Sequence, residues 1–296
     1  MNVLIVGASG YNGARVARRL TEQGHRVRGL VRDRSRAPLD LDEVVIGDVS
    51  TGAGLTEALA DIDVAYYFVH SLDATDQDDR DFAAAGHFVT AARATKLARG
   101  VFFTTLTAPA GVEPPRYQNN RIMVENELLD GIPGMTAVRA GMVLGARSRG
   151  MRPYLQLIQR APVIPMGPWR HHRMAVVDID TTTDCLVEAG TSDQPLGRIV
   201  DMPASAEPTH EELIRAIMKA LGTYRPIVRL SWSNPTFDAL LTSLFTEDSF
   251  HFSRHLASIN RYDYVVDKAR SAPFSHITAL PLDDALQLAV SVDTRR

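Results

Sequence analysis

Cysteine and lysine are both scarce in this sequence. Cys185 is the only cysteine, which excludes an intrachain disulfide and a thiolate metal cluster. It stands in an apolar stretch, Thr182 to Ala189, that predicts a buried side chain. The only lysines are Lys96, Lys219 and Lys268. Arginine therefore carries almost all of the positive charge, and a site that requires a lysine has few candidates.

Long apolar runs and a strong excess of charge are also missing. No run is long enough to span a bilayer, and Val3 to Val6 is too short for the apolar part of a signal sequence. We therefore expect a cytoplasmic protein without a membrane partner. The formal net charge of -3 gives no support for a nucleic-acid partner, because nucleic-acid binding usually needs a concentrated basic surface.

The first half of the chain alternates short β-rich runs with helical patterns, which is typical of βαβ units and a parallel sheet. Most of the runs are almost continuously apolar, as strands covered on both faces should be. The expected strands are Asn2–Val6, Arg26–Val31, Glu43–Gly47, Val64–Phe68, Val101–Thr105 and Thr136–Met142. The expected helices are Tyr11–Glu22, Gly54–Ala60, Asp81–Leu97 and Asn119–Leu129. The fold class is thus α/β, a doubly wound Rossmann-type parallel sheet of six strands or more.

After Gly145 the pattern changes. Proline and glycine between Pro162 and Pro168 predict an ordered loop or a short strand, and we assign no element to the aromatic-rich stretch Ser231–Tyr264. The other expected elements are Tyr154–Arg160 (helix), Met174–Val177 (strand), Ile179–Ala189 (helix), Arg198–Asp201 (strand), a helix capped by Thr209 with Glu212 in a capping box and running to Leu221, and Leu282–Val290 (helix). We expect a domain over residues 1–146 and a smaller C-terminal lobe over residues 147–296, interleaved because the lobe also supplies strands.

A glycine-rich segment lies between the first strand and the first helix: Gly7-Ala8-Ser9-Gly10-Tyr11-Asn12-Gly13. This strand–loop–helix context makes it a strong signal for dinucleotide binding. Gly7 permits a tight turn, Gly10 lets the backbone approach a pyrophosphate, and Gly13 lets the helix pack on the sheet. The N–H groups and the positive dipole end of the helix would bind the phosphates. The alternative is a purely structural glycine turn, which the flanking elements disfavour.

The second strand ends in Val31-Arg32-Asp33-Arg34. Arg32 stands about where a carboxylate accepts the ribose hydroxyls of NAD. A guanidinium at this place suits a 2′-phosphate, so the sequence favours NADP(H) over NAD(H). The neighbouring carboxylate of Asp33 weakens this argument, and Arg32 could equally be a solvated surface arginine. After the third strand, Asp48 is placed to accept from the adenine amine or to cap the following turn.

Five motifs follow one another along the chain: Gly7–Gly13, Val31-Arg32-Asp33, Tyr67-Phe68-Val69-His70-Ser71, Val138–Gly145 and Met174–Asp178. Together they resemble the atypical short-chain dehydrogenase/reductase superfamily and, within it, the NmrA-like branch. The resemblance extends to about Leu230 and implies a substrate cleft beside the last two motifs.

In that superfamily a Tyr-x-x-x-Lys pair on the helix after the fifth strand works with a hydroxyl at the end of that strand. The resemblance implies that Tyr117 is the proton donor and that Arg121 takes the place of the lysine. Arginine keeps the charge but is effectively never deprotonated, so a ribose contact survives better than a proton relay. Thr105 is favoured over Thr107 as the hydroxyl partner. A partly exposed loop tyrosine after Pro114-Pro115 is the alternative for Tyr117.

His70 closes the fourth strand, at the carboxyl edge where open α/β sheets bind ligands. We expect it to contact the cofactor or to move a proton, the alternative being a satisfied structural histidine. Further cofactor contacts are expected from residues near strand ends, namely Val49, Val69, Thr104, Ala140 and Met142. A run of aspartates lies before and at the start of the expected Asp81–Leu97 helix: Asp73, Asp76, Asp78, Asp79 and Asp81. It lacks the glycine and the terminal glutamate of a calcium loop, so we expect no metal site there. We expect these carboxylates in the first turn of that helix, where they complement the helix dipole.

Together these features predict an NADP(H)-dependent oxidoreductase that transfers a hydride to a small organic carbonyl, imine or activated alkene. Residues 1–146 would bind the cofactor, and residues 147–296 a fairly apolar small-molecule substrate. Two alternatives stay open: an NADP-binding NmrA-like regulator or structural subunit without redox turnover, and a non-redox cyclase or isomerase. The chain could be a monomer or a homodimer, because Ala84, Phe88 and Ala91 fit a dimer face as well as the chain's own sheet.

Overall fold

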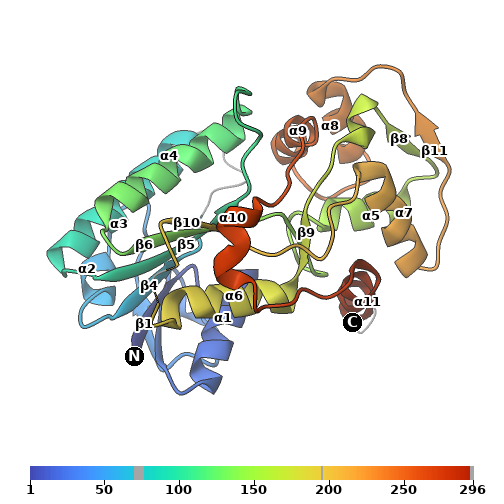
Figure 1. The fold of residues 1–296 in the computed structure, drawn as a ribbon. Coiled ribbons are helices and arrows are strands. Elements are labelled where there is room, and N and C mark those ends of the chain that lie inside the picture. Colours follow the sequence, from blue (N-terminus) through green and yellow to red (C-terminus); the bar gives the residue numbers. More distant parts are fainter. Residues whose placement is uncertain (70–76, 195, 294–296) are drawn as a thin grey trace. The chain divides into compact units, whose positions relative to one another are not determined.

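The computed structural model describes residues 1–69, 77–194 and 196–293 (Figure 1). The chain forms two compact units, each built from several segments. Unit 1 comprises Met1–Thr105, Asn119–Arg139 and Thr183–Asp201. Unit 2 comprises Leu106–Gln118, Ala140–Thr182 and Met202–Arg296.

Unit 1 is built on a seven-stranded sheet, which confirms the predicted Rossmann-type class. The order is β3-β2-β1-β4-β5-β6-β10, so chain order reverses between β1 and β4. The pairs β1–β2, β1–β4, β2–β3, β4–β5 and β6–β10 are all parallel. The strands are β1 (Asn2–Val6), β2 (Arg26–Val31), β3 (Glu43–Ile46), β4 (Val64–Tyr67), β5 (Arg99–Thr105), β6 (Met135–Ala140) and β10 (Ile199–Asp201). Ligands bind at such a reversal point, beyond the carboxyl ends of the strands.

Helices cover both faces of this sheet (Figure 1). Neighbouring tyrosines of β4 point to opposite faces, as strand geometry requires: the Tyr66 hydroxyl donates to the Val187 carbonyl of α6, whereas the Tyr67 ring packs against Phe88 of α3. The helices that enter unit 1 are α1 (Tyr11–Glu22), α2 (Leu55–Ala58), α3 (Gln77–Ala94), α4 (Arg116–Gly131) and α6 (Ile179–Thr191), with the short 3₁₀ turn η1 (Arg34–Arg36). Ala84, Phe88 and Ala91 are buried in this core, which favours the reading that they pack on the chain's own sheet.

Unit 2 has two small parallel strand pairs, β7–β9 and β8–β11. Its elements are β7 (Met142–Leu144), α5 (Arg152–Arg160), β8 (Ile164–Met166), η2 (Pro168–His171), β9 (Val176–Asp178), α7 (His210–Ala220), β11 (Ile227–Arg229), α8 (Pro235–Ser243), α9 (Phe250–Ile259), α10 (Lys268–Ser271), η3 (Ala272–Phe274) and α11 (Leu282–Asp293). The predicted capping box at the start of α7 is present, with Thr209 and Glu212 bonded reciprocally. None of the helices within the described residues is long and apolar enough to cross a membrane.

Three predicted element boundaries were wrong in ways that matter for the site. The strand expected over Thr136–Met142 ends at Ala140, because the Met142 N–H donates to the Ala175 carbonyl and the next residues pair with β9 instead. The helix expected to begin at Asp81 begins at Gln77, so Asp81 lies one turn inside it and is buried. The helix expected to begin at Asn119 begins at Arg116 and therefore includes Tyr117.

Candidate functional site

The glycine loop connects β1 to α1 and is shaped by two close approaches. Gly7 has φ +95°, a conformation that L side chains rarely adopt. A Cβ at Gly13 would lie 2.4 Å from the Gly7 carbonyl oxygen, far closer than van der Waals contact allows. The Gly10 N–H closes the turn by donating to the same oxygen at 3.0 Å. Glycine at positions 7 and 13 is therefore a steric requirement of this loop.

Helix α1 starts directly at this loop. Gly10 is its N-cap residue and has no side chain that could bond to the first N–H groups of the helix. Ser9 and Gly10 are exposed, whereas Gly13 is buried. The Oδ1 atom of Asn12 is buried and has no hydrogen-bond partner among the described residues. The positive end of this twelve-residue helix and an open backbone loop together suit an anionic diphosphate.

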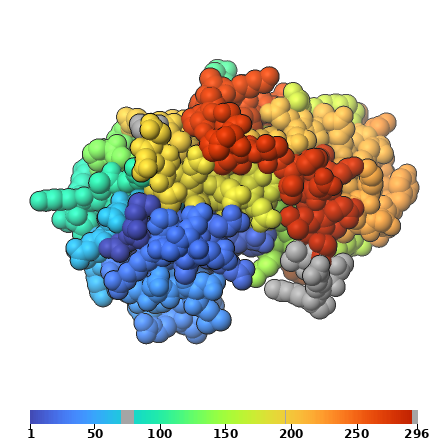
Figure 2. Space-filling model, turned by 60° about the horizontal axis from the view of Figure 1, so that its bottom comes forward, coloured from blue at the N-terminus to red at the C-terminus, as the bar shows by residue number. Residues whose placement is uncertain are grey.

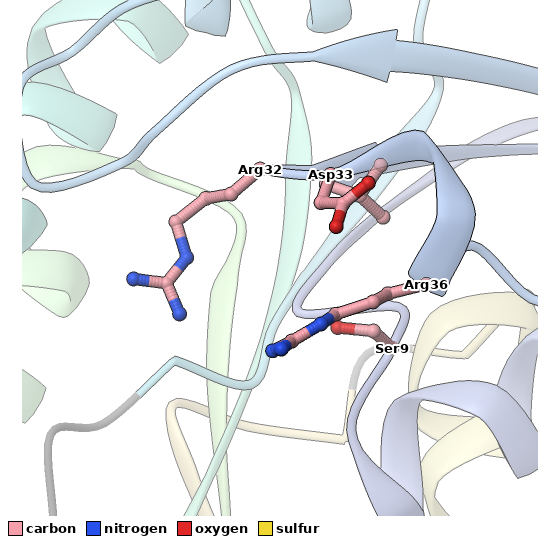
Figure 3. Close-up of a pocket in the computed structure, with 5 residues that line it drawn as sticks. Ser9, Arg32, Asp33 and Arg36 are labelled. Carbon is pink, nitrogen blue, oxygen red and sulfur yellow. The ribbon is translucent and has the colours of Figure 1, made fainter.

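Beside the glycine loop lies a cavity of about 310 Å³ lined by Ser9, Val31, Arg32, Asp33 and Arg36 (Figure 3). Its volume falls at the lower end of small-molecule sites, roughly 300–1,000 Å³. Arg32 follows the last residue of β2, and Arg36 ends η1. Residues 1–50, blue in Figure 2, form a continuous part of the surface of unit 1, and both arginines are exposed within this segment. The two guanidinium groups make the cavity a place for an anion.

The carboxylate of Asp33 is held by its own turn. Its Oδ1 accepts from the Ser35 hydroxyl at 2.8 Å and from the Ser35 N–H at 2.9 Å. These two bonds, and to a smaller extent the charge of Arg36, lower the pKa of Asp33. Arg34 does not line the cavity and donates instead to the Val44 carbonyl at 3.4 Å.

Asp48 follows β3 and caps the next turn, the second of its two predicted roles. Its Oδ1 accepts from the Ser50 hydroxyl at 2.7 Å and from the Ser50 N–H at 2.9 Å. Burial acts to raise the pKa of Asp48, but the two Ser50 bonds and the charge of Arg32 outweigh it, so the pKa is lowered. The neighbouring Val49 is buried. The adenine contact predicted for Asp48 stays a prediction.

The next two strands place further residues at the same edge of the sheet. Val69, just beyond β4, lies 3.6 Å from the position of a Cβ at Gly7. Thr104 and Thr105 end β5, and Thr104 is buried. Because β1, β2, β3, β4 and β5 run parallel, their carboxyl ends share one edge, and unit 1 therefore brings the glycine loop, Arg32 and Thr105 to that edge.

Arg121 is almost completely buried, with 3% of its surface exposed. Its Nη2 donates to the Phe103 carbonyl of β5 at 3.0 Å, and its guanidinium lies 4.9 Å from the centre of the Phe102 ring. The Nε and Nη1 atoms have no hydrogen-bond partner within the described part of the chain. A buried guanidinium with these unpaired N–H donors suits hydrogen bonds to ribose hydroxyls. The resemblance predicts this ribose contact for Arg121.

Tyr117 lies in the first turn of α4, one helical turn before Arg121, and not in a loop. It is 9% exposed, and its ring centre is 5.3 Å from that of His255 in α9. The next residue, Gln118, is anchored within unit 2: it donates to the Leu106 carbonyl at 2.9 Å and accepts from the Tyr264 hydroxyl at 3.1 Å. The start of the helix that carries Tyr117 is therefore fixed by buried hydrogen bonds.

The remaining predicted residues fall elsewhere. Ala140 ends β6 and Met142 begins β7, both buried and both in unit 2. His70 lies outside the described residues, as do Asp73 and Asp76. No group of three potential metal ligands was found among residues 1–69, 77–194 and 196–293. Asp81 is buried in α3 beyond its first turn, which corrects the predicted position.

Two residues of the site were missed in the sequence. Arg36 could have been found, because Asp33-Arg34-Ser35 is an aspartate followed two residues later by serine, which is typical of a capped turn. Such a turn keeps the residues that follow it near the end of β2, where Arg36 lines the cavity together with Arg32. His255 has no comparable signal, since it lies 138 positions after Tyr117 in the sequence and meets it only through the fold of unit 2.

Comparison with known proteins agrees with this geometry. Residues 7–131 match a family described as NAD(P)H-binding. No curated protein matches the chain in sequence. A nucleoside-diphosphate-sugar epimerase from Staphylococcus aureus is similar in structure, with a TM-score of 0.77 and 17% identity over 97% of this chain and 100% of its own.

Two further solved structures are similar over almost their full length. The enzyme WbmH of Bordetella bronchiseptica, in complex with NAD+, has a TM-score of 0.73 and 18% identity, covering 99% of this chain and 98% of its own. UDP-glucose 4-epimerase from Thermotoga maritima, with UDP-glucose, has a TM-score of 0.74 and 12% identity, covering 100% and 99%. At these identities the likeness shows a shared fold, and the family match covers residues 7–131, which include the glycine loop, Arg32 and Arg121.

Proposed function

We propose that this chain, whose NAD(P)-binding domain is of the atypical short-chain dehydrogenase/reductase type, is an NADP(H)-dependent oxidoreductase. Its substrate would be a small organic carbonyl, imine or activated alkene. The observation that carries the proposal is the cavity beside the glycine loop, lined by Arg32, Arg36 and Ser9. The NmrA-like branch remains a prediction within this superfamily.

The cavity favours NADP(H) over NAD(H) on charge. A 2′-phosphate carries about two negative charges near neutral pH, and two guanidinium groups can form charge-assisted hydrogen bonds with it. The one carboxylate in the cavity, Asp33, has one oxygen occupied by two bonds from Ser35. Arg32 and Arg36 would hold the phosphate, and the start of α1 would hold the diphosphate.

The groups proposed for catalysis are Thr105 at the end of β5, Tyr117 and Arg121 of α4, and His70, which lies outside the described residues. When bound, the cofactor supplies the hydride. Tyr117 would donate a proton to the substrate atom that becomes negative, with Thr105 or His70 stabilising that atom by a hydrogen bond. Arg121 would hold the nicotinamide ribose through its Nε–H and Nη1–H, while its Nη2–H stays on the Phe103 carbonyl. The guanidinium stays charged, so it orients and stabilises without relaying a proton.

Cofactor choice is tested by fluorescence titration of the purified chain with NADPH and NADH. The wild type should bind NADPH more tightly. Arg32→Ala and Arg36→Ala should each weaken NADPH binding about 10-fold, the scale of a lost charge-assisted hydrogen bond, and leave NADH binding nearly unchanged. Equal affinity of the wild type for both cofactors would contradict the NADP preference.

Redox turnover needs a separate test. Cinnamaldehyde offers a carbonyl and an activated alkene in one apolar molecule, and NADPH oxidation can be followed by absorbance with the product identified by chromatography. Tyr117→Phe should lower kcat at least about 100-fold, the usual contribution of a general acid, with the Kd of NADPH unchanged. Unaltered turnover in Tyr117→Phe would remove Tyr117 from the mechanism.

A second candidate is a dinucleotide-binding regulator or structural subunit without turnover. Arg121 favours it, because the guanidinium that replaces the superfamily's lysine cannot relay a proton. Tight NADPH binding, combined with no oxidation by aldehydes, quinones, imines or activated alkenes, would support this candidate over the enzyme.

A further inference from the structure

The turn after β2 is closed by four hydrogen bonds within five residues. The Asp33 carboxylate accepts twice from Ser35, at 2.8 and 2.9 Å. The Arg36 N–H donates to the Asp33 carbonyl and the Ala37 N–H donates to the Arg34 carbonyl, both at 3.1 Å. A 3₁₀ turn of three residues is too short to be stable by itself, so the two side-chain bonds to Asp33 are a large part of what holds it.

This turn decides which of its arginines lines the cavity. In 3₁₀ geometry residues three apart lie on the same side, and Asp33 and Arg36 both line the cavity, as Figure 3 shows. Arg34, in the same turn, donates to the Val44 carbonyl of β3. If the turn opened, Arg36 would lose its fixed direction, and the cost of ordering it would have to be met on binding.

We propose that Asp33 is a positioning residue for the cofactor phosphate: its carboxylate holds the η1 turn that directs Arg36 into the cavity. The proposal rests on the NADP(H) preference inferred above. It predicts that the two properties of Asp33, its charge and its role as a hydrogen-bond acceptor, have opposite effects on the affinity for NADPH. As a charge, Asp33 repels a phosphate, so its removal should tighten NADPH binding; as a hydrogen-bond acceptor it supports Arg36, so its removal should weaken binding.

Two substitutions at this position separate charge from acceptor. Asn keeps a side-chain oxygen that can cap the turn but has no charge, whereas Ala removes both. By fluorescence titration of the full chain, Asp33→Ala should raise the Kd of NADPH about 3- to 10-fold, the range of a lost cap. Asp33→Asn should leave it unchanged or lower it. Ser35→Ala, which removes one of the two donors, should give a smaller rise than Asp33→Ala.

A double-mutant cycle tests whether Asp33 acts through Arg36. In an Arg36→Ala background, Asp33→Ala should no longer raise the Kd of NADPH. Arg34→Ala is the matched control, because it removes the same charge from the same turn at a place outside the cavity; it should change the Kd less than about 2-fold, the small effect expected of an exposed charge.

Each other result overturns the proposal. If Asp33→Ala and Asp33→Asn both tighten NADPH binding, Asp33 acts by charge alone. If Asp33→Ala weakens binding equally with and without Arg36, it does not act through Arg36. If the wild type prefers NADPH but Asp33→Ala changes nothing, only this inference fails. A wild type that binds NADH as tightly as NADPH overturns the cofactor preference as well.

Discussion

Glu125 of α4 and Arg139 of β6 form a bidentate ion pair inside unit 1. The Arg139 Nε donates to one carboxylate oxygen at 3.0 Å, and its Nη2 donates to the other at 2.5 Å. The two side chains are only 2% and 9% exposed. Glu125 lies one turn after Arg121 on α4, so this pair fixes the helix that carries the catalytic candidates against the sheet.

Glu125→Gln should therefore destabilise the protein by about 3 kcal/mol, because Arg139 would remain in a buried site without its carboxylate. Asp130→Asn is the control: Asp130 pairs with Arg198 at 2.6 Å, but the side chains are 77% and 63% exposed, and such pairs contribute about 0–1 kcal/mol. Urea unfolding followed by circular dichroism measures both. Equal losses would show that burial of the first pair has no energetic consequence.

Gly13→Ala should abolish tight cofactor binding. The new Cβ would lie 2.4 Å from the Gly7 carbonyl oxygen, so the loop or α1 must move. We expect the Kd of NADPH to rise at least about 10-fold, since helix, loop and phosphate site depend on this approach. In contrast, Gly86→Ala, in α3 with nothing within 4 Å of the added Cβ, should keep wild-type binding and gain about 0.5–1 kcal/mol of stability. Wild-type affinity in Gly13→Ala would show that the loop can relax.

Arg121→Met should lower kcat/KM for NADPH-dependent reduction about 100-fold or more, because it removes a charge placed for the ribose. Arg121→Lys should retain most of the activity if charge is what counts, although it cannot reproduce the planar guanidinium that bonds the Phe103 carbonyl. The control is Arg93→Met, which removes another arginine bonded to a backbone carbonyl, Gly131, at 3.0 Å. Activity lost to the same degree in Arg93→Met would point to a general loss of structure.

Acid should destabilise unit 2 through His210. This residue is fully buried against Tyr154 and Trp169, and burial lowers its pKa to about 3 from an ordinary value near 6.5. Below that ordinary value the unfolded chain takes up a proton that the folded chain does not, so the free energy of unfolding falls with falling pH. At pH 5 the loss is about 2 kcal/mol, at roughly 1.4 kcal/mol per pH unit.

The measurement is urea unfolding at pH 7 and at pH 5. The wild type should lose more stability than His210→Gln does between the two values, whatever the absolute stability of the variant. His171→Gln, at an exposed histidine in η2, should follow the wild type. A pH dependence that survives in His210→Gln would assign it to other groups.

The parts of the fold that were predictable have strong local causes. The glycine loop, α1 and the capping box of α7 are each determined by residues within a few positions, so pattern and capping identified them. The switch from β6 to β7 depends on a partner strand far along the chain, β9, and no local pattern in Thr136–Met142 shows it. The same contrast holds in the site, where Arg32 follows from its distance to Gly13 but the contact of Tyr117 with His255 does not.

The first residue of α4 was difficult to predict from the sequence, and it determines whether Tyr117 belongs to that helix. The helix was expected to begin at Asn119, yet α4 begins at Arg116, directly after Pro114 and Pro115, since proline is well suited to stand just before or within a first helical turn. That shift of three residues places Tyr117 on the helix together with Arg121. Tyr117 and Arg121, the pair that the resemblance implies, therefore lie four residues apart on one helix.

The position of β10 has a consequence for the synthesis of this protein. β10 pairs with β6 and replaces it as the edge strand of the main sheet with a strand of only three residues, but residues 141–198 come between them in the chain. During synthesis on the ribosome, β6 lacks its partner strand until Asp201 has emerged. An unpaired edge strand can form hydrogen bonds with a strand of another chain. A fragment that stops at residue 146 would keep the whole glycine loop and yet carry this edge permanently, so we expect it to aggregate instead of serving as a portable cofactor-binding domain.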